Sequence, residues 1–345
     1  MKMKLKRIEL IGLWGKFNLN WDLTESLNIL SGINGSGKTT VLDIIAAILI
    51  RGKMTDLIEN KTEQVIITFE DNSQLVSVSF KDSLLKLRQK AQENEIFLEL
   101  WNDVTKDLSE KKRLSEIKQL KINASISYLQ KRGKKIPVKS FLDKLNIDII
   151  STFDTALPPH TELSRIDQLH AEGVYTALDL DLYLLQEKYA YYLGNLANQV
   201  EMQILSSHSI KSKDLYHLYE QKQLFFDIID DMFKETNKRI NRKSARLEFI
   251  TFDDNHKLSV YELSSGEKQL LYIYLTILME QQEEYIVFMD EPEISLHIDW
   301  QAVLIENMYK LNPNCQIIMS THAPYIVLHG WKMRVTNIEN IKEKI

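Results

Sequence analysis

Apolar and polar residues alternate at the start of the chain, and apolar residues then become continuous in short runs. Alternation over 3–10 and 17–21 predicts half-buried strands, and the run at 27–31 predicts a more buried one. The segment VLDIIAAILI that follows has the period of a helix. From 64 to about 101 a period near two returns in VIITF, LVSVSF and IFLELW, which predicts an antiparallel meander beside the first strands.

The second half of the chain changes its period twice. Apolar residues at spacings of three and four over 178–205 and 214–237, joined by SSHSIKSKD, predict a helical hairpin. The last hundred residues alternate apolar strands (ARLEFITF, KLSVY, YIVFM, CQIIMS) with helices, which predicts a parallel sheet covered on both faces. We therefore expect an α/β fold with an antiparallel β-subdomain and a helical lobe, divided at 1–155, 156–245 and 246–345.

Composition narrows the class of protein. The chain has 345 residues, 44% of them hydrophobic, and a net charge of −5, so the overall charge requires neither nucleic acid nor an anionic membrane. Residues 106–139 are the exception, with eleven Lys or Arg against three acidic residues. This segment is either a solvated loop or a patch that contacts nucleic acid or an acidic partner.

The cysteine content and the length of the apolar runs indicate the cellular compartment in which the protein works. Cys315 is the single cysteine, which excludes an intramolecular disulfide, and its place in an apolar strand favours a buried thiol over a nucleophile. The N-terminus lacks the continuous apolar core of a signal peptide, and no apolar run approaches the ~20 residues that span a bilayer. We expect a cytoplasmic protein without a membrane segment.

The segment GINGSGKT, residues 32 to 39, matches GxxxxGK[ST] between a predicted strand and a predicted helix. This is the context of a phosphate-binding loop, whose backbone N–H groups and helix N-terminus hold phosphate oxygens. Lys38 is expected to neutralise the β and γ oxygens, and Thr39 to place its hydroxyl on Mg²⁺, so the implied ligand is a nucleoside triphosphate with its metal. The remaining expected ligand-binding residues of this loop are Asn34, Gly35, Ser36, Gly37 and Thr40.

Two further strands end in residues that suit phosphate chemistry. Asp290 and Glu291 follow the strand IVFM, so Asp290 is expected in the Mg²⁺ shell and Glu291 as the general base for the attacking water. His322 follows the next strand and would emerge at the same carboxyl edge of the sheet, where it could contact the γ-phosphate and that water.

The stretch ELSSGEKQLL, residues 262 to 271, has the residues of an ordinary helix start. Ser264 or Ser265 can cap the helix that follows, with Glu267 as the capping-box partner. Capping explains only half of the stretch, because it does not require the flexible Ser-Ser-Gly.

These motifs in this order resemble an ABC-type ATPase: GINGSGKT, LSSGE, IVFMDE and THAP. EKQ after the glycine and EPEISLH after the base resemble the SMC, RecF and OLD-like branch rather than transporter subunits. The resemblance implies a homodimer or larger homo-oligomer in which Ser264, Ser265 and Gly266 of one copy close over ATP on another. It also implies that Glu293, Ser295 and His297 lie in the loop bridging the two sites, and that Lys16 reaches the α-phosphate.

The resemblance leaves the family's glutamine switch loop unplaced. Thr152 and Asp154 stand where that glutamine would be sought after the strand IDIIST, and Gln130 is the other candidate. Only about twenty residues follow the His322 region, so we do not expect at that end the Toprim nuclease that OLD proteins carry.

The resemblance favours an ATPase that dimerises around ATP and gates a separate effector, a nuclease or toxin, as in stand-alone ABC ATPases of bacterial anti-phage systems. A RecF-like ATPase that binds DNA through residues 106–139 is the alternative. A transporter subunit is a third hypothesis, which the EKQ motif disfavours.

Overall fold

The computed structural model describes residues 3–79, 89, 91–92, 98, 101–102, 125–131, 134–136, 138–150, 168–207, 212–244, 246–328 and 330–345. A five-stranded sheet with all pairings parallel lies at the centre, in the order β14-β3-β13-β12-β8. These strands have the bounds Val335–Asn337, Leu27–Ser31, Gln316–Ser320, Ile286–Asp290 and Ile147–Ile150. The predicted parallel sheet is therefore confirmed.

A seven-stranded sheet lies beside it, in the order β15-β2-β1-β4-β5-β6-β7, and all its pairings are antiparallel. Its strands have the bounds Lys342–Lys344, Phe17–Asp22, Leu5–Leu13, Gln64–Phe69, Gln74–Ser79, Ser125–Lys131 and Lys134–Ile136. The predicted meander is confirmed for its first two strands. Its predicted third strand, IFLELW, is wrong at its described positions, because Leu98 and Trp101 are helical, and β6 pairs with β5 instead.

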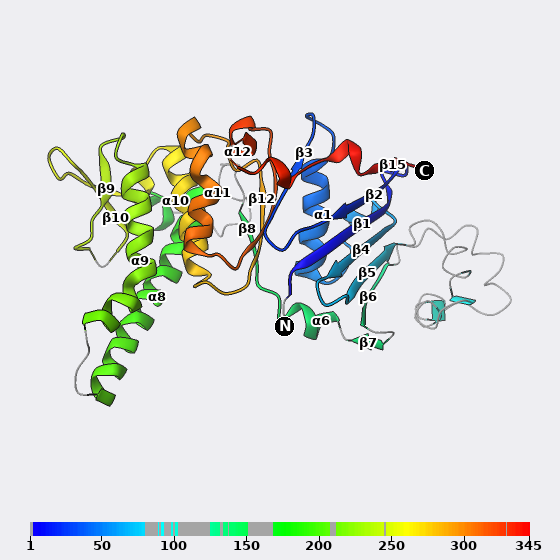
Figure 1. The fold of residues 1–345 in the computed structure, drawn as a ribbon, viewed down its shortest axis with the longest axis horizontal. Helices are drawn as coiled ribbons and strands as arrows, with labels where there is room; N and C mark the ends of the chain where they lie inside the picture. Colours follow the sequence, from blue (N-terminus) through cyan, green and yellow to red (C-terminus); the bar gives the residue numbers. More distant parts are fainter. Residues whose placement is uncertain are drawn as a thin grey trace.

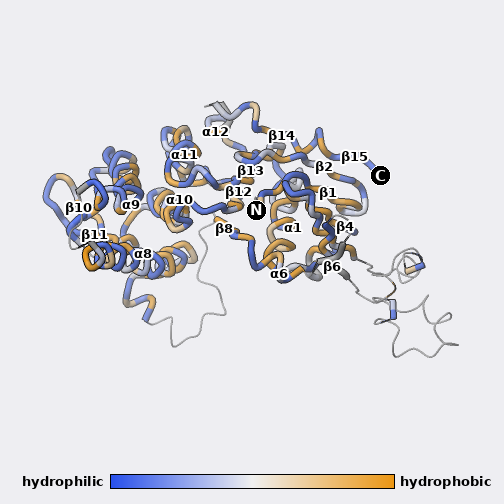
Figure 2. The backbone as a smooth tube through the Cα atoms, turned by 60° about the horizontal axis from the view of Figure 1, so that its bottom comes forward, coloured by the Kyte–Doolittle hydropathy of each residue, from blue (hydrophilic) through white to orange (hydrophobic). Residues whose placement is uncertain are grey.

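Helix α1 (Lys38–Arg51) lies between the two sheets (Figure 1). It is largely apolar along its length (Figure 2), as a helix covered on both sides must be. Two short helices, α2 (Asp56–Glu59) and α6 (Val138–Leu142), complete this half of the molecule.

Each parallel strand contributes to two hydrophobic cores because its side chains alternate between the faces of the sheet. In β12, Ile286 and Phe288 pack with α1 and the antiparallel sheet, whereas Val287 and Met289 pack with the helices on the other face. The continuous apolar runs of the sequence are explained by this double coverage.

The second core is built by helices α8 (Ala177–Ser207), α9 (Ser212–Met232), α10 (Ser265–Met279) and α11 (Ile298–Leu311). Helices α8 and α9 form the predicted hairpin, which projects away from the sheets in Figure 1. At about 1.5 Å per residue, the 31 residues of α8 span about 46 Å.

A third, three-stranded antiparallel sheet lies next to α9, in the order β11-β10-β9, with bounds Lys257–Ser259, Glu248–Thr251 and Lys238–Ile240. It contains residues 248–251 of ARLEFITF and 257–259 of KLSVY, so the expectation that these strands share the parallel sheet is wrong. The five residues between Thr251 and Lys257 allow only a hairpin, since parallel neighbours need a crossover of a dozen or more residues. Another short helix, α12 (Pro324–Leu328), follows β13.

Candidate active site

The loop 32–37 connects β3 to α1 and turns on two glycines in the left-handed region, Gly35 at φ 78° and Gly37 at φ 100°. Gly37 is also confined sterically, because a Cβ there would lie 2.1 Å from the Trp14 ring. Trp14, in the turn between β1 and β2, therefore packs directly on this loop. Only glycine fits the backbone conformation and the space at position 37.

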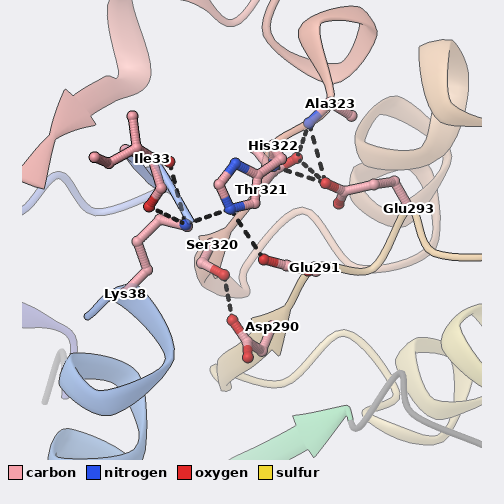
Figure 3. A network of polar contacts seen from close by, with 10 residues as sticks. Ile33, Lys38, Asp290, Glu291, Glu293, Ser320, Thr321, His322 and Ala323 are labelled. Atoms are coloured by element: carbon pink, nitrogen blue, oxygen red, sulfur yellow. Dashed lines mark hydrogen bonds and ion pairs between the residues drawn. The ribbon is translucent and has the colours of Figure 1, made fainter. Parts of the chain in front are cut away.

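Lys38 begins α1, and its side chain turns back under the loop (Figure 3). Its Nζ donates to the carbonyl oxygens of Gly32 at 3.2 Å and Ile33 at 3.4 Å, and it lies 2.5 Å from Nε2 of His322. The residue is buried. A lysine ammonium fixed at the centre of this loop is placed to meet anionic oxygens entering it.

The acidic and histidine residues reach this loop because their strands are neighbours in the sheet. Strand β13 lies between β3 and β12, and Ser320 pairs with both Leu30 and Asp290, so the three carboxyl ends are level. Glu291 follows with φ 49°, an uncommon conformation for a residue other than glycine. The turn directs its carboxylate toward His322 (Figure 3).

His322 stands between Lys38 and Glu291. Its Nε2 lies 3.2 Å from Oε1 of Glu291 in addition to its contact with Lys38. A single ring nitrogen either accepts from the lysine or donates to the carboxylate, so the tautomer decides which contact is a hydrogen bond. A ligand that draws Lys38 away leaves Nε2 free to donate to Glu291 or to that ligand.

Asp290 and Thr39 line the same cavity of about 700 Å³, between α1 and strands β8 and β12. Asp290 accepts a hydrogen bond from the hydroxyl of Ser320, and Thr39 is exposed. Asp43, one helical turn after Thr39, lines this cavity too. Burial raises the pKa of Asp43, the charge of Lys61 opposes this, and the charge of Asp290 adds to it.

The donor set fits ATP and Mg²⁺. The hydroxyl Oγ of Ser36 is buried without a hydrogen-bond partner in the described structure, inside the loop that would hold phosphates. Thr39 and Asp290 supply the hydroxyl and carboxylate oxygens that Mg²⁺ prefers. Among the described residues no group of three His, Cys, Asp or Glu side chains could hold a metal alone.

The Ser-Ser-Gly turn starts α10, and Ser264 caps it. The Ser264 hydroxyl and the Glu267 side chain form a reciprocal capping box. Ser264 and Ser265 are exposed, whereas Gly266 is buried, because the carbonyl oxygen of Ser295 would lie 2.3 Å from a Cβ there. The loop after Glu291 thus packs directly behind this helix start, and no hydrogen bond or ion pair within the described chain joins the turn to loop 32–37.

Buried ion pairs hold the start of α10 to the elements on either side. Glu267 is fully buried and accepts from Thr236 Oγ1 at 2.6 Å and Lys238 Nζ at 2.9 Å. Burial opposes its ionisation, but bonds from Thr236, Lys238 and Ser264 outweigh it and hold the pKa of Glu267 below its ordinary value. The next residue, Lys268, donates to Asp179 in the first turn of α8 at 2.7 Å. The exposed serines therefore stand on a rigid base.

The other predicted residues lie in this loop and helix or farther along the chain. Lys16 is exposed in the β1–β2 turn, two residues after Trp14, and Thr40 is half-buried in the first turn of α1. Asn34 is exposed in loop 32–37, and Gln130 is exposed in β6, in the antiparallel sheet. Thr152, Asp154 and most of the basic segment lie outside the described residues.

Cys315 is confirmed as a buried thiol, and burial raises its pKa, which disfavours the nucleophilic thiolate.

Two residues near the loop escaped sequence reasoning. Trp14 packs on Gly37, and the largely buried Lys342 donates from Nζ to the carbonyl oxygen of Ser36 at 3.2 Å. The turn GKF drew attention to Lys16, but the left-handed conformation of Trp14 at φ 54° was not readable from it. Lys342 is 306 residues from Ser36 and reaches it only because β15 pairs with β2. No local pattern could have indicated that contact.

The helices of the described segments are all too short or too polar to cross a membrane.

Residues 27–328 match the protein family described as "AAA domain, putative AbiEii toxin, Type IV TA system". The chain is 23% identical to the "Retron Vc95 probable ATPase" of Vibrio cholerae serotype O1 biovar El Tor, over 94% of this chain and 71% of that protein. It is also 23% identical to the "Septu protein PtuA" of Bacillus thuringiensis, over 94% of this chain and 72% of that protein. Among solved structures, the SMC head domain from Thermotoga maritima covers 99% of the chain at 13% identity, with a TM-score of 0.48.

Proposed function

The chain belongs to this AAA-domain family, and we propose that it hydrolyses ATP in an ATP-bridged dimer that controls a separate effector protein. The observation that carries the proposal is the meeting of Lys38, Glu291 and His322 at the carboxyl edge of the parallel sheet. A fixed cation, a carboxylate and an imidazole beside a phosphate-binding loop are the groups that hydrolysis of a phosphoanhydride requires. We also propose that the chain is divided into three parts, at 1–155, 156–245 and 246–345.

Each residue then has a role in the reaction. The N–H groups of loop 32–37 and Lys38 would bind the phosphates, and Thr39 and Asp290 would hold Mg²⁺, which when bound would neutralise charge on the phosphate oxygens. Glu291 accepts a proton from the attacking water. His322 donates from Nε2 to the γ-phosphate once Lys38 has turned to the phosphate oxygens. Lys16 lies two residues after Trp14, which packs on Gly37 of this loop, and we propose that it contacts the α-phosphate.

The exposed serines support the dimer. Ser264 and Ser265 stand at an outward-facing helix start that no described polar contact links to its own loop 32–37. Helix N-termini bind anions, so a second copy would bring this turn over the γ-phosphate of the first. Ser264 would then exchange part of its cap for the phosphate. Because each copy supplies both halves, a head-to-tail pair contains two complete sites.

The proposal of a separate effector rests on the relatives. One is named a retron ATPase and another a Septu protein, and the motifs resemble stand-alone ATPases of anti-phage systems. We propose that dimerisation around ATP changes the surface offered to a nuclease or toxin, and that the protein acts in the cytoplasm. Copurification of a nuclease or toxin with the chain only when ATP is present would support this step. Equal copurification with and without ATP would contradict it.

Replacement of the general base tests the reaction. In Glu291→Gln, steady-state ATP hydrolysis should fall at least ~100-fold because the amide cannot take the proton from water. Binding of ATP, measured by equilibrium titration, should stay within about threefold, because Lys38 and the loop are untouched. Slow hydrolysis should also accumulate the ATP-bound dimer in sedimentation experiments.

Glu306→Gln is the matched control. Glu306 is an exposed residue of α11 that pairs with Lys310, so its variant should hydrolyse ATP at the wild-type rate. If Glu291→Gln kept the wild-type rate, or remained monomeric with ATP bound, the proposed mechanism would be wrong.

A further inference from the structure

Strands β12 and β13 separate immediately beyond the site, and one side chain spans the gap. Their paired residues end at Asp290 and Ser320, and one more backbone bond follows, from the amide of Glu291 to the carbonyl of Ser320 at 3.0 Å. Past this point the two backbones are joined by the carboxylate of Glu293 (Figure 3). Sequence reasoning gave this residue only a place in the loop between two sites.

One oxygen of Glu293 holds three consecutive residues. Its Oε1 accepts from the Thr321 hydroxyl at 2.6 Å, from the His322 amide at 2.8 Å and from the Ala323 amide at 3.0 Å. Hydrogen bonds to an ionised acceptor are stronger than those between neutral groups. The backbone of His322 is therefore fixed at its own amide and at both neighbouring residues, which fixes the point from which its ring extends toward Glu291 and Lys38.

The second oxygen of Glu293 argues for a role beyond stability. Its Oε2 is buried without a hydrogen-bond partner in the described structure. A buried acceptor that has lost its water is unfavourable, so a carboxylate is a poor choice for packing alone. What the carboxylate supplies is a rigid acceptor for three donors at one point.

What this contact positions is the imidazole of His322. Its Nε2 is within 3.2 Å of Glu291 and 2.5 Å of Lys38. A misplacement of about 1 Å in a catalytic group can cost roughly 100-fold in rate. A loop that swings free at residues 321–323 would exceed that tolerance.

We propose that Glu293 is a positioning residue that holds the His322 loop, so that the imidazole stays in contact with Glu291 and Lys38. Glu293 acts through the backbone and does not touch the nucleotide. This inference rests on the proposed ATP hydrolysis for its effect on rate, but its structural part stands on the contacts alone.

Four variants test it by hydrolysis kinetics: Glu293→Ala, Glu293→Gln, His322→Ala and the double variant Glu293→Ala/His322→Ala. Glu293→Ala should lower kcat roughly 100-fold with KM for ATP within about threefold, because the phosphate-binding loop is unchanged. Glu293→Gln keeps a carbonyl acceptor and should recover at least about tenfold of that loss. The double variant should be no slower than His322→Ala, because the clamp has no purpose without the ring.

Hydrogen exchange supplies a readout that is independent of activity. The amide of His322 should lose protection in Glu293→Ala, whereas the amide of Ala323 keeps Thr321 Oγ1 as a second acceptor at 2.9 Å and should lose less. Exchange in β12 should stay unchanged. Thr321→Val removes one of the three donors and keeps the fold, so it should show a smaller loss of both protection and kcat.

The outcomes separate this inference from the proposed function. Multiplicative losses in the double variant, or unchanged protection of residues 322 and 323 in Glu293→Ala, would overturn the positioning role. A wild-type protein that fails to hydrolyse ATP while Glu293→Ala loses that protection would overturn the proposed function and retain the clamp.

Discussion

At the scale of single residues, steric confinement decides more than chemical type. Gly266 was predicted as a contact to phosphate in a second copy, and the structure adds a requirement within the chain, since the Ser295 carbonyl occupies the space of a Cβ. The sequence ELSSGEKQLL could not reveal this, because Ser295 comes from a loop 29 residues away that reaches α10 only through folding. The same glycine thus serves the helix start and the loop behind it.

Substitution of Gly266 should lower the free energy of unfolding because of its contact with the Ser295 carbonyl, and a control variant can test this cause. Gly266→Ala places a methyl group 2.3 Å from a backbone oxygen, so the loop carrying Glu293 and Ser295 must shift. We expect the free energy of unfolding to fall by roughly 1–3 kcal/mol. Gly194→Ala is the matched control, since Gly194 lies in the interior of α8 with nothing within 4 Å of a Cβ.

The control should change stability in the opposite direction. Alanine in an exposed helix interior is favoured over glycine by about 1 kcal/mol, so Gly194→Ala should raise the free energy of unfolding. Urea denaturation of both variants measures the difference. Similar losses in the two variants would show that the Ser295 contact does not confine position 266.

At the scale of elements, periodicity predicted the helices and strands that a single segment forms. It failed where the structure depends on which strands pair with each other. Several elements could be predicted because the apolar residues of each segment follow the period of the structure that it forms. These are the strand–loop–helix at 27–51, the hairpin helices and the parallel strands β12 and β13. The strand predicted at IFLELW and the sheet assigned to ARLEFITF were wrong, because a short apolar run is compatible with helix or strand and with either sheet. Partner choice between strands is a long-range property.

The buried end of α10 carries an ionisable group whose effect on stability depends on pH. Glu280 is almost fully buried, and Asn312 donates to its Oε2 at 2.5 Å, but Oε1 has no partner among the described residues. Burial raises its pKa from 4.5 to about 9, a shift that the bond from Asn312 opposes and the charge of Asp148 increases. The folded protein therefore keeps this proton where the unfolded chain has lost it.

The sign of the linkage follows from this difference. Between pH 4.5 and about 9 the folded state binds more protons at Glu280, so its contribution to stability falls as pH rises through that window. Glu280→Gln removes the ionisation and keeps the acceptor for Asn312. The variant should equal wild type near pH 4.5 and exceed it by up to about 3 kcal/mol at pH 7.

Denaturation at several pH values measures this gain, with Glu283→Gln, an exposed neighbour, as the control that should show none. A gain that stays constant from pH 5 to pH 8 would contradict a raised pKa at Glu280.

At the scale of the whole molecule, the residues proposed to act on ATP form two halves on one chain. Lys38, Glu291 and His322 meet at the edge of the sheet, while Ser264 and Ser265 stand on α10 without a described polar contact to them. Sequence motifs indicated both halves because each is local. The proposed dimer would bring the two halves together across its interface.

Mixing two inactive variants distinguishes a site shared between copies from a site within one copy. Lys38→Ala destroys the phosphate-binding half, and Ser264→Arg places a bulky cation on the exposed turn while leaving ATP binding nearly intact. If each site takes one half from each copy, a heterodimer holds one site with both lesions and one intact site. Random pairing of equal amounts makes half of the dimers mixed, so about a quarter of the wild-type rate should return if the two sites act independently.

Subunits must be allowed to exchange before the assay, and Glu306→Gln mixed with Lys38→Ala gives the reference for dilution alone. Hydrolysis by either variant alone, or a mixture as inactive as its components, would place the reaction within a single copy.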